Sequence, residues 1–239
     1  MGMNDVDHER PGGRHPDHHG HGHGQGQGHG HDHDQGLKGF LRYLRHAPEM
    51  WTSEVNDAVV ARLDPQADET VMDIGAGMGA GSMVAARSGC MVMAIEPTPY
   101  MRRILGLRAR LKRLQHRVHV IDGAAEATGV DDGSIDAAWA VNTMHHWTDM
   151  ASGVRELARV MAPGGRILLV DEDFDDPAHP DHESFGAGRH EDHSHHFHMV
   201  DADEVATVMR EAGLSVTSAG KDTIAGRPAI IMEATAPSA

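Results

Sequence analysis

Short apolar runs alternate with amphipathic segments along most of this chain. Between the apolar runs, apolar positions recur at helical spacing around residues 82–88, 98–115 and 149–161. Strands that alternate with helices in this way indicate a parallel sheet covered by helices on both faces. Five runs have the length and composition of buried strands: VMDI (71–74), MVMAI (91–95), VHVI (118–121), IDAAWAV (135–141) and RILLV (166–170).

The C-terminal part adds one helix and two strands to this pattern. Residues 200–213 have helical spacing, with Asp201 as the predicted N-cap and Gly213 as the residue that ends the helix. Residues 214–236 then read as two strands. We therefore predict an α/β fold with a doubly wound sheet and a late hairpin.

The N-terminal part differs sharply from the rest in composition. Residues 1–36 are rich in Gly, His, Asp and Gln and have almost nothing to bury, so we predict a disordered His/Gly-rich tail. Residues 37–67 read as a helical lead-in to a single domain over 37–239. Histidines that alternate with Gly or Asp suit loose binding of Ni²⁺, Zn²⁺ or Cu²⁺, and an inert, pH-sensitive solubilising tail is the alternative.

Charge and composition exclude several classes of protein. The formal net charge of −15 disfavours a nucleic-acid partner, and the basic residues over 102–117 fit the wet face of an amphipathic helix. The single cysteine, Cys90, excludes an intramolecular disulfide and a thiolate zinc cluster within one chain. The sequence shows neither an N-terminal apolar leader nor a membrane-length apolar run, which predicts a cytoplasmic protein without a membrane partner.

The segment VMDIGAGMGAGS (71–82) carries the sharpest signal of a binding site. A strand runs into Gly75-x-Gly77-x-Gly79 and then into a helix, a turn where the backbone bends tightly and a ligand approaches closely. Glu96 ends the next strand, where it suits the hydroxyls of a ribose on either a dinucleotide or another nucleoside ligand. Asp73 is unfavourable beside a pyrophosphate but suits a ligand that carries an ammonium and a sulfonium.

Four blocks in order resemble one enzyme family: VMDIGAGMG, AIEPTPYM, DGAAEATGVDDGSIDAAWAVNTMHHW and RELARVMAPGGRILLVDE. Over roughly residues 68–173 the chain resembles the class I S-adenosylmethionine-dependent methyltransferases, specifically the small-molecule group called type 11. The resemblance implies a Rossmann-like seven-stranded sheet with an antiparallel last strand. It also implies S-adenosyl-L-methionine as cofactor and a small-molecule methyl acceptor.

By position, the resemblance also implies roles for residues at the ends of the strands. Those at the first strand meet the methionine and ribose portion of the cofactor, and those at the second hold the ribose diol. Those at the third meet the adenine, although Asp122 also fits a helix cap or a solvated loop residue, and the residue at the fourth forms the floor near the sulfonium. These residues are Asp73, Gly75, Gly77, Glu96, Pro97, Asp122, Gly123, Ala124 and Asn142.

His145 and His146 are the candidate catalytic residues, because they follow the fourth strand where the methyl group is expected. Methyl transfer mainly requires alignment of donor and acceptor, and a general base matters when the acceptor must lose a proton. One of the two histidines is positioned to accept that proton, with Trp147 as a pocket wall. The alternative is that His-His-Trp serves packing.

Residues 174–199 form a long His-rich connection, which we interpret as a lid loop over the site. A metal site, a contact surface for an acidic or oxygen-rich substrate, and a polar loop are the three alternatives. Imidazoles with a carboxylate suit Zn²⁺ or Ni²⁺, although no established ligand spacing is present. The candidate metal ligands are His190, His193, His195, His196 and His198.

Three functions compete on this basis. The first is a methyltransferase that acts on a small molecule, with a metal-binding His-rich lid as a further feature. The second is a metal-binding or sensing protein that keeps the methyltransferase fold with little turnover. The third, a nicotinamide-dependent oxidoreductase, rests on the Gly-rich turn alone.

Overall fold

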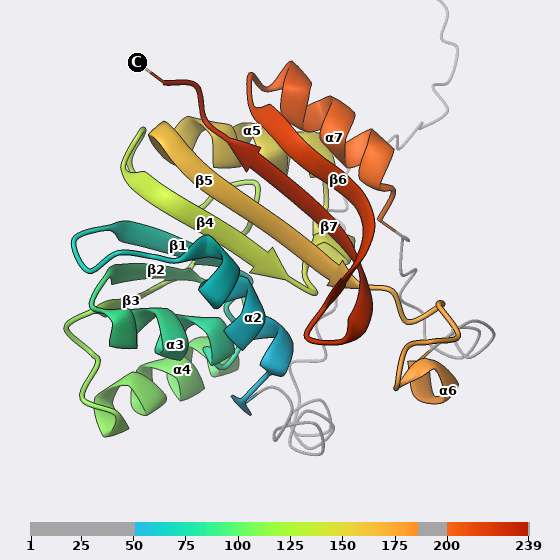
Figure 1. Cartoon of the computed structure of the whole chain (residues 1–239). Coiled ribbons are helices and arrows are strands. Elements are labelled where there is room, and N and C mark those ends of the chain that lie inside the picture. The colour runs from blue at the N-terminus through green and yellow to red at the C-terminus, as the bar shows by residue number, and fades with distance from the viewer. Residues whose placement is uncertain (1–50, 186–199, 239) are drawn as a thin grey trace, which may run out of the picture. The chain divides into compact units, whose positions relative to one another are not determined.

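The computed structural model describes residues 51–185 and 200–238. Its centre is a seven-stranded sheet in the order β3-β2-β1-β4-β5-β7-β6 (Figure 1). Strands β1 to β5 pair in parallel, and β7 runs antiparallel to both of its neighbours. This confirms the predicted seven-stranded Rossmann-like sheet with an antiparallel last strand. The strands are β1 (Thr70–Ile74), β2 (Met91–Ile95), β3 (Val118–Ile121), β4 (Ile135–Val141), β5 (Met161–Glu172), β6 (Ser215–Ile224) and β7 (Arg227–Thr235).

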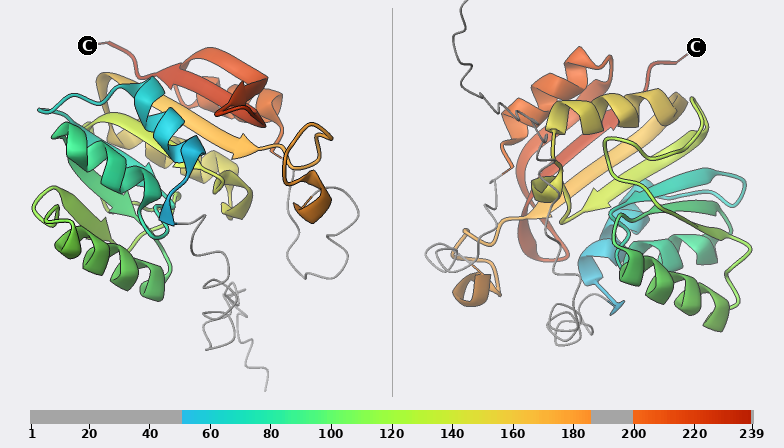
Figure 2. Two further views of the ribbon diagram at one scale, coloured as in Figure 1. Left: turned by 60° about the horizontal axis from the view of Figure 1, so that its bottom comes forward. Right: turned by 180° about the vertical axis from the view of Figure 1, so that it is seen from behind.

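Helices cover both faces of the sheet, as the alternating pattern predicts (Figure 2). On one face lie α2 (Glu54–Leu63), α3 (Ala80–Ser88) and α4 (Pro99–Leu111), and on the other lie α5 (Met150–Val160) and α7 (Ala202–Glu211). A short 3-10 helix, η1 (Met144–His146), follows β4, and α6 (His182–Phe185) follows β5. The sheet is therefore doubly wound.

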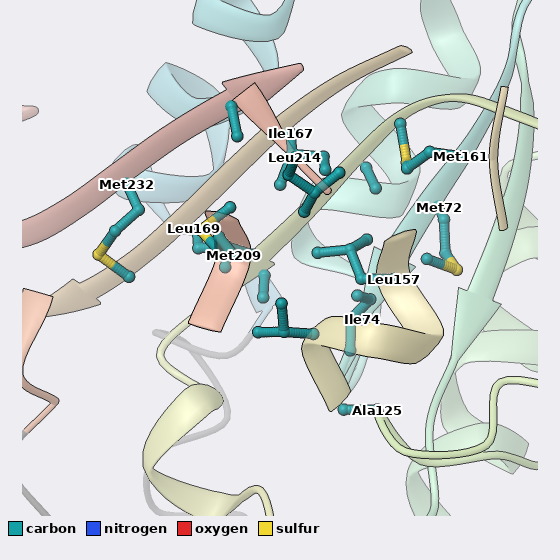
Figure 3. Close-up of a cluster of buried hydrophobic side chains, with 14 of the residues drawn as sticks. Met72, Ile74, Ala125, Leu157, Met161, Ile167, Leu169, Met209, Leu214 and Met232 are labelled. Carbon is teal, nitrogen blue, oxygen red and sulfur yellow. The ribbon is translucent and has the colours of Figure 1, made fainter. Parts of the chain in front are cut away.

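Two hydrophobic clusters hold the helices to the sheet, one on each face. Successive side chains of a strand point to opposite faces. Accordingly, Met72 and Ile74 belong to the cluster under α5 and α7, whereas Val71 belongs to the cluster under α2 and α3. Figure 3 shows Leu157 of α5 and Met209 of α7 within the first cluster. Full burial of each such side chain contributes roughly 1.5–3 kcal/mol to the stability of the fold. The strand ends that carry the candidate site are therefore held by a well-packed core.

The ends of two helices show how the local sequence sets their bounds. Asp201 accepts hydrogen bonds from the backbone of Asp203 and Glu204, which confirms it as the N-cap of α7. Gly213 has a positive φ of 87° just after that helix, as predicted. Helix α4 ends at Leu111, earlier than the periodicity indicated, because Arg113 adopts a φ of 59° that breaks the helical backbone.

Some of the predicted segments lie outside the described residues. These are the tail over 1–36, the part of the lead-in before residue 51, and residues 186–199 of the predicted lid. The five candidate metal-binding histidines all fall in the last of these. Among the residues that the structure describes, no helix has the length and apolar character needed to cross a bilayer.

Candidate active site

The glycine-rich turn between β1 and α3 has a left-handed backbone at its three spaced glycines. A Cβ at Gly75 would overlap the side chain of Thr143, and one at Gly79 would overlap Leu105, so packing within the protein requires both glycines. Gly77 is different: its φ is 53°, and a Cβ there would meet only the Gly75 carbonyl oxygen at 4.0 Å. The turn is thus open at Gly77, where a ligand can approach the backbone.

Glu96, at the end of β2, is tied directly to this turn. Its carboxylate accepts hydrogen bonds from the backbone N–H of Gly77 and of Thr98, each at 2.8 Å, and the residue is only 6% exposed. Each carboxylate oxygen has more than one acceptor position, so both retain capacity for further donors such as ribose hydroxyls. Pro97 lies between Glu96 and the N-cap Thr98 of α4. The structure therefore brings Gly77, Glu96 and Pro97 together.

Asp73 is a second buried carboxylate at the same turn. It is 3% exposed and accepts a hydrogen bond from the Ser82 hydroxyl at 2.6 Å. Burial raises the pKa of Asp73 to about 6, the Ser82 hydrogen bond opposes this, and the charge of Glu96 adds to it. In the described part of the chain, no ion pair joins either carboxylate to a basic side chain. Such a pair of buried acids favours a cationic ligand.

The residues after β3 contribute an exposed carboxylate and a tightly packed turn. The side chain of Asp122 is 74% exposed and accepts a hydrogen bond from Arg102 at 2.7 Å. Arg102 also donates to the backbone oxygens of Glu96 and Pro97, so it connects the second and third strand ends. The sequence pattern missed Arg102, because it lies in a run of basic residues that reads as a helix surface.

Gly123 and Ala124 complete this loop. A Cβ at Gly123 would lie 2.9 Å from the Thr128 oxygen, so packing against the following segment excludes a larger residue. The backbone of Ala124 exchanges hydrogen bonds with that of Ala127. The loop is therefore held in one conformation next to the Asp122–Arg102 ion pair.

Asn142 follows β4 and adopts a left-handed backbone with a φ of 54°, which Asn tolerates better than most residues. Its side-chain amide donates to Glu172 Oε1 at 2.6 Å and accepts from the Glu172 backbone N–H at 2.7 Å. Asn142 thus joins the ends of β4 and β5, and its side chain is fixed by Glu172.

His145 and His146 lie on η1, directly after Asn142 and Thr143. The carboxylate of Asp171, at the end of β5, accepts from the backbone N–H groups of Thr143 (3.0 Å), Met144 (3.4 Å) and His145 (3.3 Å). It also contacts His145 Nδ1 at 2.9 Å. The sequence pattern missed Asp171, and the only signal for it was an acidic run at the end of the fifth strand.

The two histidines differ in their surroundings. The side chain of His145 is 13% exposed, whereas His146 is exposed, and their ring centroids are 4.1 Å apart. Trp147 packs closely on Gly153 of α5. The His145 ring contacts the Asp171 carboxylate through Nδ1.

The first part of the predicted lid, residues 174–185, is anchored to the same edge of the sheet. Buried His179 contacts Glu172 Oε2 through Nε2 at 3.0 Å and accepts from the Asp181 backbone N–H at Nδ1. Arg227 bridges Glu172 and Asp181. Over residues 51–185 and 200–238, no group of three His, Cys, Asp or Glu side chains is arranged to hold a metal ion.

The strand order, with polar residues at the carboxyl ends of β1, β2 and β4, is typical of nucleotide-binding α/β proteins. Residues 72–169 match the family model described as a methyltransferase domain. A structure of an S-adenosylmethionine-dependent methyltransferase from Aquifex aeolicus superposes with a TM-score of 0.59 at 17% identity, over 79% of this chain and 92% of that chain. The chain therefore has the fold of a class I S-adenosylmethionine-dependent methyltransferase, and its residues 72–169 match a methyltransferase domain.

Relatives of known sequence agree with this assignment. An uncharacterised methyltransferase of Mycobacterium bovis is 38% identical over 106 residues, which are 44% of this chain and 41% of that protein. A demethylmenaquinone methyltransferase of Corynebacterium kroppenstedtii is 33% identical over 120 residues, or 50% of this chain and 48% of that protein. The matched part thus spans less than half the length of either relative.

Proposed function

We propose that the protein transfers a methyl group from S-adenosyl-L-methionine to a small-molecule acceptor. The observation that carries this proposal is the pair of buried carboxylates, Asp73 and Glu96, beside the open turn at Gly77. Two acids buried without a basic partner in the described residues suit a ligand with an ammonium and a sulfonium. A dinucleotide pyrophosphate would meet the repulsion of Asp73 instead, which disfavours an oxidoreductase.

The proposed cofactor contacts follow the strand ends. Glu96 accepts the ribose hydroxyls, Gly77 lets the ligand approach the backbone beside Gly75, and Asp73 supplies negative charge near the methionine portion. The cofactor, when bound, supplies an electrophilic methyl group with a good leaving group. The remaining proposed contacts are Pro97, Asp122, Gly123, Ala124 and Asn142.

A small-molecule acceptor is the proposal that fits the relatives. One of them is named for demethylmenaquinone, a small molecule rather than a protein or nucleic acid. The formal net charge of −15 is unfavourable for a nucleic-acid acceptor. A cytoplasmic location stays a prediction from the sequence.

We further propose that His190, His193, His195, His196 and His198 bind a divalent metal, Zn²⁺ or Ni²⁺. The support is the density of imidazoles in the sequence, because these residues lie outside the described ones. A metal-binding or sensing protein with little turnover is the alternative function. Labelled methyl transfer to any acceptor contradicts that alternative.

Calorimetric titration with S-adenosylhomocysteine tests cofactor binding, with Gly77→Ala as the variant. We expect its affinity to fall at least about tenfold, because the new methyl group occupies the ligand's approach to the turn. Its free energy of unfolding should fall by only about 1–2 kcal/mol from the left-handed backbone. Gly106→Ala in α4, where a Cβ meets nothing within 4 Å, is the matched control and should bind normally.

Transfer of a labelled methyl group to a panel of small hydroxyl, amine and thiol compounds tests the reaction itself. Tight binding of a nicotinamide dinucleotide with no binding of S-adenosylhomocysteine would overturn the proposed function.

A further inference from the structure

We propose that Arg108 is a positioning residue that fixes the glycine-rich turn in the shape that binds the cofactor, with Trp51 covering its guanidinium. This inference rests on the proposed methyltransferase function and deepens it. The sequence pattern assigned Arg108 to the wet face of a helix, together with the other basic residues of that segment. In the structure Arg108 is instead only 4% exposed and contacts the turn.

Arg108 contacts the turn at the residue that follows its open position. Its Nη1 donates a hydrogen bond to the Met78 carbonyl oxygen at 3.0 Å, and Met78 directly follows Gly77. This bond therefore orients the peptide unit next to the place where we propose that the ligand approaches the backbone. Leu105, three residues earlier and so on the same side of α4, lies against Gly79. Helix α4 thus holds the two turn residues that come after Gly77.

The burial of this guanidinium is costly, which argues for a role beyond packing. Within the described residues, no acidic side chain forms an ion pair with Arg108, and its Nε has no hydrogen-bond partner. Desolvation lowers the pKa of Arg108, and the charge of Arg87 adds to this. An apolar side chain of similar length would fill the space without the cost of a buried cation. Such a side chain could not make the hydrogen bond to Met78, so that bond is the contact that explains an arginine here.

Trp51 stabilises the buried cation in place of an acid. The guanidinium carbon of Arg108 lies over the Trp51 ring, 4.7 Å from its centroid, where the negative face of the indole attracts a cation. Trp51 comes just before α2, and Figure 1 shows α2 and α4 on the same face of the sheet. The indole is 40% exposed, so it covers the guanidinium from the solvent side. The residue that precedes α2 is therefore linked to the glycine turn through Arg108.

Hydrogen exchange of the unliganded full chain, followed by nuclear magnetic resonance, tests whether Arg108 orders the turn. The backbone N–H groups of Ala76, Gly77 and Gly79 are all hydrogen-bonded at the turn and report on it. We expect Arg108→Met to speed their exchange about tenfold, while the amides of β7 keep the wild-type rate. Unchanged exchange at the three turn amides would overturn the proposal. Equal acceleration in β7 would show a general loss of stability and would overturn it as well.

Calorimetric titration with S-adenosylhomocysteine tests what this ordering contributes to binding. We expect Arg108→Met to lower the affinity about tenfold. Arg108→Lys should lower it less, because lysine keeps a charged donor but loses the planar head that faces Trp51. In methyl transfer the loss should appear in KM for S-adenosylmethionine, with kcat and the KM of the acceptor unchanged. A merely structural role would lower the free energy of unfolding and leave the affinity of the folded protein unchanged, which would contradict the proposal.

Trp51→Leu tests the part that the indole plays. The affinity for S-adenosylhomocysteine should fall about two- to fivefold, the size of effect typical of a partly exposed cation–π contact. The same substitution should cause no further loss in Arg108→Met, because the cation is then already gone. If the two losses were fully additive, Trp51 would act independently of Arg108, against the proposed coupling.

Arg103→Met is the matched control, since it removes an exposed arginine from the same helix. It should change neither the exchange of the turn amides nor the affinity for S-adenosylhomocysteine. Equal effects of Arg103→Met and Arg108→Met would mean that the charge of α4 acts at a distance, against a specific role for Arg108. Failure of the wild type to bind S-adenosylhomocysteine would contradict the proposed function, whereas the hydrogen exchange would still decide whether Arg108 orders the turn.

Discussion

At the scale of single residues, Asp73 shows how much burial of a carboxylate costs the folded protein. Burial raises its pKa from 3.8 to about 6. Between these two values the folded protein holds a proton that the unfolded chain has lost, so stability falls as the pH rises through this range. Above about pH 6 the folded protein carries the full cost, about 3 kcal/mol at most for a shift of this size.

Asp73→Asn should therefore stabilise the unliganded protein relative to wild type at pH 7.5 and much less at pH 4.5. Urea unfolding of both proteins across this range measures the difference. Asp68→Asn, at an exposed position, is the control for the chemical change itself. If the difference in unfolding free energy between Asp73→Asn and wild type did not change with pH, the predicted effect of burial would be contradicted. The same variant should bind S-adenosylmethionine more weakly.

The predicted site residues divide according to the range of the interaction that positions them. Local sequence was sufficient to select Gly77 and Glu96, because a strand end followed by a glycine turn is a local pattern. Asp171 and Arg102 were not predicted, because each contacts a partner 20 or more residues away in the chain. Asp171 contacts His145, and Arg102 contacts Asp122. One sequence alone does not specify such pairings.

At the scale of elements, we expect glycine-to-alanine substitution to have opposite effects on stability at two helical positions. Alanine favours a helix over glycine by roughly 1 kcal/mol. Gly106→Ala in α4 should raise the free energy of unfolding by about that amount, because its Cβ meets nothing within 4 Å. In Gly153→Ala of α5, the Cβ would lie 2.6 Å from Trp147 Cε3. Overpacking costs about 1–3 kcal/mol, so this variant should be destabilised.

Chemical unfolding measures both changes in stability, and methyl transfer supplies the functional readout. Because Trp147 directly follows η1, Gly153→Ala should also lower the rate, whereas Gly106→Ala should leave it unchanged. Equal stabilisation of the two variants would show that α5 can move away from Trp147.

The positions of the strands and helices were largely predictable, while several of their ends were not. All five N-terminal strands and the C-terminal hairpin appear where apolar runs predicted them. Strand β5 begins at Met161 rather than Arg166, because its first residue pairs with Ile135 before a register shift. The Gly- and Pro-containing start of this strand has no local pattern that would predict such long-range pairing.

At the scale of the whole molecule, the predicted lid is linked to the proposed cofactor site by contacts within the described residues. Glu172 holds Asn142, the predicted floor of the site, and also contacts His179 and Arg227 at the base of the predicted lid. A metal bound farther along this segment would therefore have a contiguous route to the proposed cofactor site.

Zn²⁺ titration by calorimetry tests this link, on protein that begins at Leu37 so that the His-rich tail does not compete. We expect one site of micromolar or better affinity, lost when His190, His193, His195, His196 and His198 are all replaced by Asn. Saturating S-adenosylhomocysteine should change that affinity by about fivefold or more, and by reciprocity Zn²⁺ should change the affinity for S-adenosylhomocysteine by the same factor. Equal binding to the substituted protein would place the metal elsewhere. Binding that S-adenosylhomocysteine leaves unchanged would separate the metal from catalysis, and no binding at all would make the segment a polar loop.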